Sequence, residues 1–278
     1  MTNNSLLGIH HVTAITDDAE RNYKFFTDVL GMRLVKKTVN QDDIYTYHTF
    51  FADDVGSAGT DMTFFDFPNV PKGIGGTNSI SRPSFRVPND EALSYYAQRF
   101  DEFGVKHDGV QSLFDKKVLP FEEADGQLYQ LVSDENNKGV APGIPWENGP
   151  VPTDKAIYGL GPIVILRKDT ETPEARQGYG EVHHVSFRVK DHDAIQAWHD
   201  KYTELGIGNS GLVDRFYFEA LYARIGHILI EVSTDGPGFM GDEPYETLGE
   251  ALSLPPFLEN QRDYIESEIR PFNTKRNH

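Results

Sequence analysis

The chain has 278 residues, of which 38% are hydrophobic and 12% aromatic, enough for one large or two small domains with a full core. Its 26 Lys and Arg against 43 Asp and Glu give a formal net charge of -17, which excludes nucleic acid and anionic membranes as partners because both need concentrated positive charge. The absence of cysteine excludes disulfides, thiolate nucleophiles and Cys-ligated metals, so any metal must bind to His, Asp or Glu.

The first predicted unit covers residues 1–70. An alternating apolar run over 9–15 predicts a strand, and Asp17 followed by Glu20 predicts the start of a helix that Gly31 ends. Three further stretches read as strands: "MRLVKKTV" (32–39), "YTYHTFFAD" (45–53) and "TDMTFFDF" (60–67). The order is β-α-β-β-β.

A second unit covers residues 78–136. "SISRPSFRV" predicts a strand, Asn89 a helix cap, Gly104 the end of that helix, and "QLYQLVSD" a closing strand. Residues 137–155 are rich in Pro and Gly and read as a linker. Residues 156–181 then give one strand signal and no helix, so we interpret them as the remnant of a third unit.

The last unit covers residues 182–234. It opens with the strand "VHHVSFRV", continues with a helix that Asp191 caps and Gly206 ends, and closes with the strands "FYFEALYAR" and "GHILIEVS". A tail from 235 to 278 contains one predicted helix near 257–269. The pattern predicts an α+β protein of repeated βαβββ modules in which the third of four is reduced.

Two histidine pairs, His10–His11 and His183–His184, occupy equivalent strands 173 positions apart. Neighbouring strand residues point to opposite faces, so one histidine of each pair can face a common site. Glu231 lies among aliphatic residues, where a carboxylate is costly unless it is paired or metal-bound. Two histidines and one carboxylate form the facial triad of non-haem Fe(II) oxygenases.

The other histidines lack this context and are read as ordinary, with His227 set apart because it lies near Glu231: His48, His107, His192, His199, His227 and His278.

The chain resembles the vicinal oxygen chelate superfamily of glyoxalases, bleomycin resistance proteins and extradiol dioxygenases, and within it the bacterial ring-cleaving dioxygenases of the hydroquinone type. The motifs that carry the resemblance are "LGIHHVTAIT", "YHTFFADDVGSAGTDMTFFDFP", "EVHHVSFRVKD", "GLVDRFYFEALY" and "LIEVSTDGPGFM". The resemblance implies cupped mixed sheets. It also implies Fe(II), with Mn(II) as the alternative, on His11, His184 and Glu231. Around the substrate it places His10, His183, Thr13, Arg215 and Tyr222.

The expected function is therefore ring cleavage of a hydroquinone- or catechol-like phenol with O₂. One rival is a glyoxalase-type lyase or isomerase, which usually has four protein ligands. Aligning "GTDMTFF" with "GHILIEV" places Phe64 opposite Glu231, so the fourth ligand is missing. The other rival is a non-catalytic protein that binds or sequesters an aromatic compound.

The expected setting is the cytoplasm, since the sequence shows no signal peptide and no membrane span. A homo-oligomer is expected as well. If the first and last modules pair, the second lacks a complete partner, and its apolar residues Phe85, Val87 and Leu131 would need cover from another chain, or from a stretch missing between the second and last modules.

Overall fold

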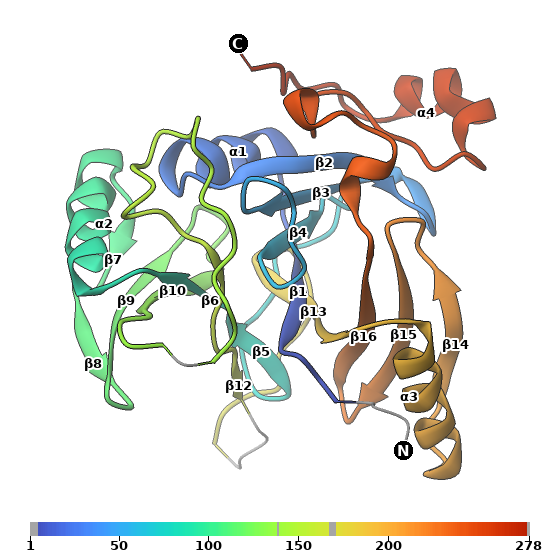
Figure 1. The fold of residues 1–278 in the computed structure, drawn as a ribbon, viewed down its shortest axis with the longest axis horizontal. Helices are drawn as coiled ribbons and strands as arrows, with labels where there is room; N and C mark the ends of the chain where they lie inside the picture. Colours follow the sequence, from blue (N-terminus) through green and yellow to red (C-terminus); the bar gives the residue numbers. More distant parts are fainter. Residues whose placement is uncertain (1–4, 138, 167–170, 277–278) are drawn as a thin grey trace.

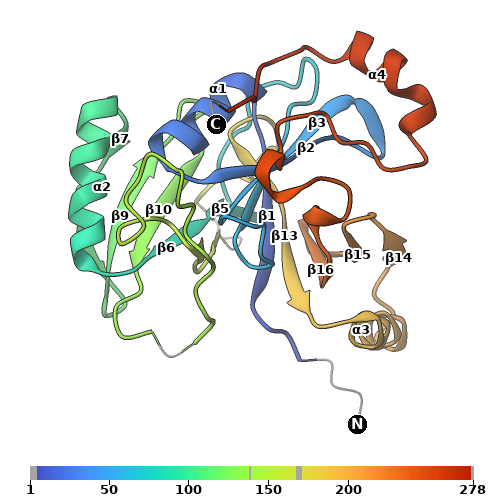
Figure 2. The same ribbon diagram turned by 45° about the horizontal axis from the view of Figure 1, so that its top comes forward.

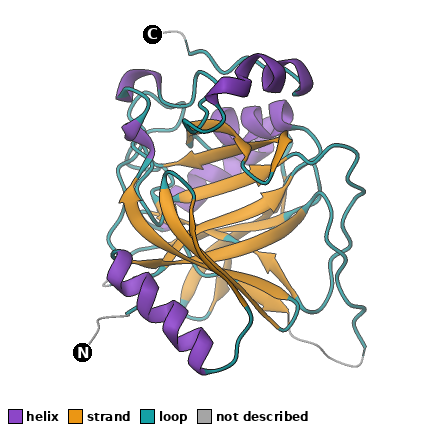
Figure 3. Ribbon diagram, turned by 90° about the vertical axis from the view of Figure 1, so that its right-hand side faces the viewer, coloured by secondary structure: helices purple, strands orange, loops and turns teal. Residues whose placement is uncertain are grey.

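The computed structural model describes residues 5–137, 139–166 and 171–276; the remaining residues, His278 among them, lie outside this description. The protein is α+β, with curled sheets carrying a few helices on their outer faces (Figures 1 and 3). No helix in the described ranges is long and apolar enough to cross a membrane.

The central sheet has eight strands in the order β14-β15-β16-β13-β1-β4-β3-β2. It joins the first and last units: β1 runs antiparallel to β13, while β4 and β16 lie parallel to β1 and β13 on the outer sides. Its strands are β1 (Ile9–Ile15), β2 (Arg33–Asn40), β3 (Asp43–Ala52), β4 (Asp61–Phe65), β13 (Glu181–Val189), β14 (Asn209–Asp214), β15 (Phe218–Ile225) and β16 (Ile228–Pro237). The two halves of the sheet are thus related by an approximate twofold axis between β1 and β13.

A second sheet belongs to the second unit and has the order β11-β6-β10-β9-β7, with β8 paired to β9. Its strands are β6 (Ser84–Val87), β7 (Lys106–His107), β8 (Gln111–Leu113), β9 (Lys116–Glu122), β10 (Leu128–Ser133) and β11 (Gly159–Leu160); β5 (Ser79–Arg82) and β12 (Val164–Leu166) form a separate pair. Strand β11 is antiparallel to β6, as β13 is to β1, so it occupies the position of a third unit's opening strand.

The helices begin and end largely where the caps predict. They are α1 (Ala19–Lys24), which continues into a π-helical turn (Phe25–Val29), α2 (Asp90–Phe103), α3 (His192–Glu204) and α4 (Arg262–Glu268), with 3-10 turns at Phe239–Gly241, Tyr245–Thr247 and Glu259–Gln261. Asn89 and Asp191 cap α2 and α3 as expected. The cap of α1 is Asp18 instead of Asp17, because Asp18 accepts from the Arg21 amide at 2.9 Å while the Asp17 amide donates to Asp125.

The expectation that the second unit needs cover from another chain is wrong in its premise. Phe85, Val87 and Leu131 are each 0% exposed within the single chain. They share one core with α2 and with Phe26 of the first unit, so the helices of the two units close this face together. The homo-oligomer remains a prediction, but this argument no longer supports it.

Apolar surface is left open on the last unit instead. A groove beside α3 is lined by Leu6, Ile165, Phe187, Trp198, Tyr202, Ile225, Ile228, Ile230 and Val232. Leu6, Ile165 and Ile225 are 43%, 41% and 49% exposed.

The C-terminal tail crosses the first unit. Figure 2 shows α4 and the segment after it lying over β2 and β3. Leu254, Leu258, Ile265 and Phe272 pack there against Val39, which explains why the predicted tail helix is ordered.

Candidate metal centre

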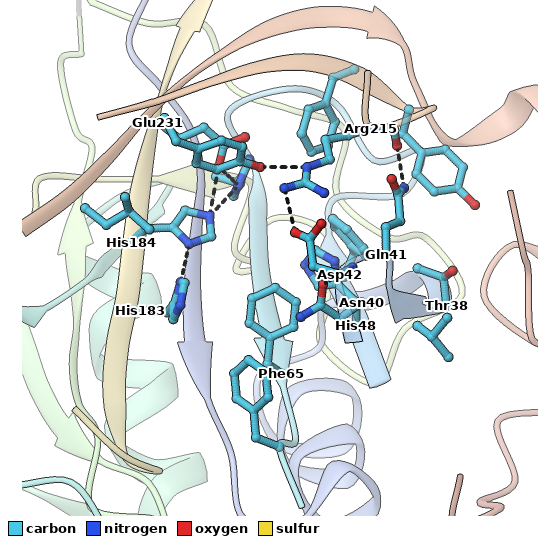
Figure 4. A pocket seen from close by; sticks show the side chains of 18 residues that line it. Thr38, Asn40, Gln41, Asp42, His48, Phe65, His183, His184, Arg215 and Glu231 are labelled. Carbon is cyan, nitrogen blue, oxygen red and sulfur yellow. Dashed lines mark hydrogen bonds and ion pairs between the residues drawn. The ribbon is translucent and has the colours of Figure 1, made fainter. Parts of the chain in front are cut away.

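Three side chains converge where β1, β13 and β16 lie side by side. His11, His184 and Glu231 are 2%, 4% and 0% exposed. The Nε2 atoms of the two histidines are 3.2 Å apart, and Glu231 Oε2 lies 3.2 Å from His11 Nε2 and 2.9 Å from His184 Nε2. The sequence prediction named these three residues, and the structure brings them together; Figure 4 shows His184 beside Glu231.

The donor set fits a divalent metal. The three donor atoms lie 2.9 to 3.2 Å from one another, close enough for all three to bind one ion with metal–ligand bonds of about 2.1 Å. Glu231 Oε2 is buried and makes no hydrogen bond to any described residue; its near polar neighbours are the two histidine Nε2 atoms, as expected of three ligands that share one ion. Among the described residues no fourth His, Asp or Glu joins the group.

The histidine pairs fix which ring nitrogen faces the metal position. His10 Nδ1 lies 2.9 Å from His11 Nδ1, and His183 Nδ1 lies 2.7 Å from His184 Nδ1. Burial lowers the pKa of both His10 and His183 to about 3, so each is neutral and can accept a hydrogen bond. With the His11 and His184 protons on Nδ1, both Nε2 lone pairs would be available to a metal, which would replace the contact of His184 Nε2 with the Thr13 hydroxyl.

The carboxylate is oriented in the same way. Ser233 donates to Glu231 Oε1 at 2.8 Å, and the Ser233 and Ser186 hydroxyls are 2.7 Å apart. Burial alone would raise the pKa of Glu231, but the neighbouring His11 and His184 outweigh it and hold that pKa well below its usual range. Glu231 is therefore ionised.

A cavity of about 280 Å³ opens beside the triad. His183, Arg215 and Tyr222 line it, together with His48, Phe65 and the β2 end (Figure 4). His10 and Thr13, which the resemblance places around the substrate, lie behind the ligand histidines and do not line this cavity. The second ring nitrogen of His10 lies 3.1 Å from the Thr234 carbonyl, and the fully buried Thr13 hydroxyl lies 3.0 Å from His184 Nε2.

Arg215 and Tyr222 form one unit on the cavity wall. Tyr222 lies directly opposite Glu231 across β15 and β16, and Arg215 Nε donates to its hydroxyl at 3.1 Å. Burial, with the nearby Glu231 carboxylate, raises the pKa of Tyr222, so this hydroxyl stays protonated. Arg215 also donates to Asp42 at 2.9 Å, so residues from both halves of the sheet close this side.

The residue of the first unit that is equivalent to Glu231 is Thr63, not Phe64. Strand pairing sets Ser186 beside Glu231 and, in the other half, Thr13 beside Thr63. Phe64 instead points into the core, where its ring centroid lies 4.8 Å from that of Phe26. Thr63 carries no carboxylate either, so the first unit offers no fourth ligand at the position equivalent to Glu231.

His48, interpreted as ordinary from sequence, lines the cavity. The sequence signal for this position is that His48 lies two residues before Phe50, and therefore on the same face of a strand rich in aromatic residues. His227 lies outside the triad, 3.5 Å from Glu174 and largely exposed.

Comparisons with known proteins match the chain to one superfamily. A profile of the "Glyoxalase/Bleomycin resistance protein/Dioxygenase superfamily" matches residues 8–231. The chain is 39% identical to the "Putative ring-cleaving dioxygenase MhqA" of Bacillus subtilis over 95% of this chain and 98% of that one. It is 28% identical to the "Chlorohydroquinone/hydroquinone 1,2-dioxygenase" of Sphingobium indicum over 93% and 94%.

Among solved structures, a "putative dioxygenase" from Bacillus subtilis superposes with a TM-score of 0.88 at 30% identity, covering 98% of this chain and 99% of that one. Glyoxalase I from Zea mays shares the fold, with a TM-score of 0.53 at 13% identity over 82% and 92%. The MhqA alignment spans 312 positions, while 95% of this chain is about 264 residues, so roughly 48 internal positions of the alignment have no residue here.

Proposed function

The chain belongs to the Glyoxalase/Bleomycin resistance protein/Dioxygenase superfamily, and from this premise we propose that it is a non-haem Fe(II)-dependent dioxygenase that cleaves the ring of a hydroquinone- or catechol-like phenol. Mn(II) is the alternative metal. The substrates are a small phenol and O₂.

The observation that carries the proposal is the three-donor set of His11, His184 and Glu231 with Thr63 in the equivalent fourth position. Three protein ligands on one face leave room for both a phenolic oxygen and O₂. A fourth carboxylate, as expected for glyoxalase-type chemistry, would occupy part of that room. The likeness to maize glyoxalase I shows the fold alone.

Bound Fe(II) would supply electron transfer between the electron-rich ring and O₂. The residues of the chain provide the rest. Arg215 stays charged and, beside the Tyr222 hydroxyl, can hold an anionic phenolic oxygen through charge-assisted hydrogen bonds. Because Tyr222 is protonated, it can also donate a proton late in the reaction.

The two outer histidines have different tasks despite their matched positions. His183 lines the cavity and its Nδ1 contacts His184, so among the described residues its other nitrogen stays available to donate a hydrogen bond to the substrate. His10 has both nitrogens engaged, on His11 and on the Thr234 carbonyl. We therefore assign His10 as a positioning residue for His11, and Thr13 as a buried hydroxyl beside His184.

The test is anaerobic loading with Fe(II), followed by measurement of O₂ uptake on addition of hydroquinone or catechol. The proposal expects uptake with a phenol and none with the hemithioacetal of methylglyoxal and glutathione. Isomerisation of that hemithioacetal without O₂ uptake would favour the glyoxalase-type alternative, and phenol binding without metal would favour a sequestering protein.

A further inference from the structure

Two polar side chains, Thr38 and His48, interrupt the aromatic wall of the metal cavity, and we call this pair the polar notch. Strand pairing sets Thr38, His48 and Phe65 in one row across β2, β3 and β4. All three line the cavity, and Figure 4 shows Thr38 on the side away from His184 and Glu231. Nothing in the metal site described above requires a polar group in this row.

His48 is held in one orientation. Its ring packs with Phe50 and Phe65 at centroid distances of 4.0 and 4.4 Å, and its Nε2 lies 3.0 Å from the Thr63 hydroxyl. The Thr63 hydroxyl in turn lies 2.7 Å from that of Thr13. The position that could have carried a fourth ligand thus serves to hold His48.

These contacts engage only one of the two ring nitrogens. Within the part of the chain that the structure describes, no hydrogen-bond partner is found for His48 Nδ1, although the side chain lines the cavity. Burial lowers the pKa of His48 well below its usual range, so the ring is neutral and offers one donor and one acceptor.

Thr38 supplies an independent observation. It is 2% exposed, and its buried hydroxyl makes no hydrogen bond to any described residue. A buried hydroxyl without a partner destabilises the protein, and a polar group bound beside it would recover that loss. Thr38 stands directly across from His48 in the strand register.

We propose that His48 and Thr38 bind a second hydroxyl of the substrate, one remote from the oxygen that faces the metal. The proposal rests on the proposed function for the identity of the first oxygen. A neutral imidazole and a threonine hydroxyl both donate and accept, so they match a hydroxyl better than a carboxylate or an ammonium group. Thr63 acts through His48 as a positioning residue.

The experiment compares two ligands, hydroquinone and phenol, which differ only in the remote hydroxyl. Binding is measured by calorimetry on Fe(II)-loaded protein without O₂, so no turnover is needed. The wild type should bind hydroquinone about tenfold more tightly than phenol, as one buried hydrogen bond predicts. His48→Phe keeps a stacked ring and should bind the two ligands equally, with the affinity for phenol unchanged.

Two further variants guard against a merely structural effect. His48→Asn keeps a polar atom near the Nδ1 position and should restore most of the preference, and Thr38→Val removes only a hydroxyl and should reduce it. Survival of the preference in His48→Phe, an equal loss of both ligands, or no preference in the wild type would overturn the proposal. A preference that depends on His48 without any O₂ uptake would instead overturn the proposed function and leave the notch in place.

Discussion

Replacing Glu231 by Gln removes one negative charge from the triad while keeping the shape of the side chain. In the structure this carboxylate is 0% exposed and is the sole anion among the three donors. Loss of a residue that merely orients a ligand costs about 10–100-fold in metal affinity, so loss of the anionic ligand should cost at least about 100-fold.

The effect can be read as thermal stability. At a metal concentration about 100 times the wild-type Kd, binding stabilises the native state by about 2.7 kcal/mol, which raises Tm by about 5–10 °C in a chain of this size. With the Kd raised 100-fold, the same concentration stabilises the variant by only about 0.4 kcal/mol, or about 1 °C. Melting curves with and without Fe(II) or Mn(II) under anaerobic conditions, together with elemental analysis, give both numbers.

Glu219→Gln is the matched control, because Glu219 lies on the neighbouring strand β15 and contacts the exposed His192 instead of the triad. It should retain the full metal-induced rise in Tm. One metal per chain in Glu231→Gln after dialysis, with the wild-type rise in Tm, would refute the assignment of Glu231 as a ligand.

Three further outcomes are expected. His10→Phe should weaken metal binding about 10–100-fold, because it removes the acceptor for His11 Nδ1, while the KM for the phenol at saturating metal stays unchanged; unaltered metal affinity would count against the positioning role. Arg215→Met should raise the KM about 10–100-fold with full metal content, as loss of a hydrogen bond from a charged group predicts, and an unchanged KM would show that Arg215 does not hold the substrate. Burial, with the nearby Asp125, raises the pKa of Glu123 to about 7. The native state therefore holds this proton more tightly than the unfolded chain does. As a result, the free energy of unfolding falls as the pH rises from about 4.5 to about 7. Glu123→Gln should remove that fall, gaining about 1–3 kcal/mol at pH 8 and nothing at pH 4 in urea unfolding, and identical pH profiles would contradict it.

The sequence predicted the parts of the fold that depend on local signals. Short stretches of sequence determine these features, which the structure confirms: the alternating strands, the Asn89 and Asp191 caps and the glycines at the helix ends. The triad could also be predicted from the sequence, because two equivalent histidine pairs and one carboxylate among aliphatic residues form an unusual pattern.

What failed depended on register and on distant packing. Counting from Gly59 and Gly226 placed Phe64 opposite Glu231, but a shift of one residue along a strand reverses the face that a side chain occupies, and Thr63 holds the position. Alternation left open whether His10 points outward or supports His11; the β1–β13 pairing is irregular at His10, and its ring meets that of His11 edge to face.

The cover over the second unit was missed for a different reason. It comes from α2 and from the first unit's own helix, and the sequence gives no sign that helices of two units share one core. His48 was missed because its role depends on the curvature that brings β3 to the cavity.

The most direct test of the central claim is oxygen-18 labelling of the product. Fe(II)-loaded protein supplied with hydroquinone and oxygen-18 gas should yield a ring-opened acid that contains oxygen from the gas, and Glu231→Gln should yield none. A wild-type protein that binds one iron per chain and consumes hydroquinone without incorporating oxygen-18 would contradict the account.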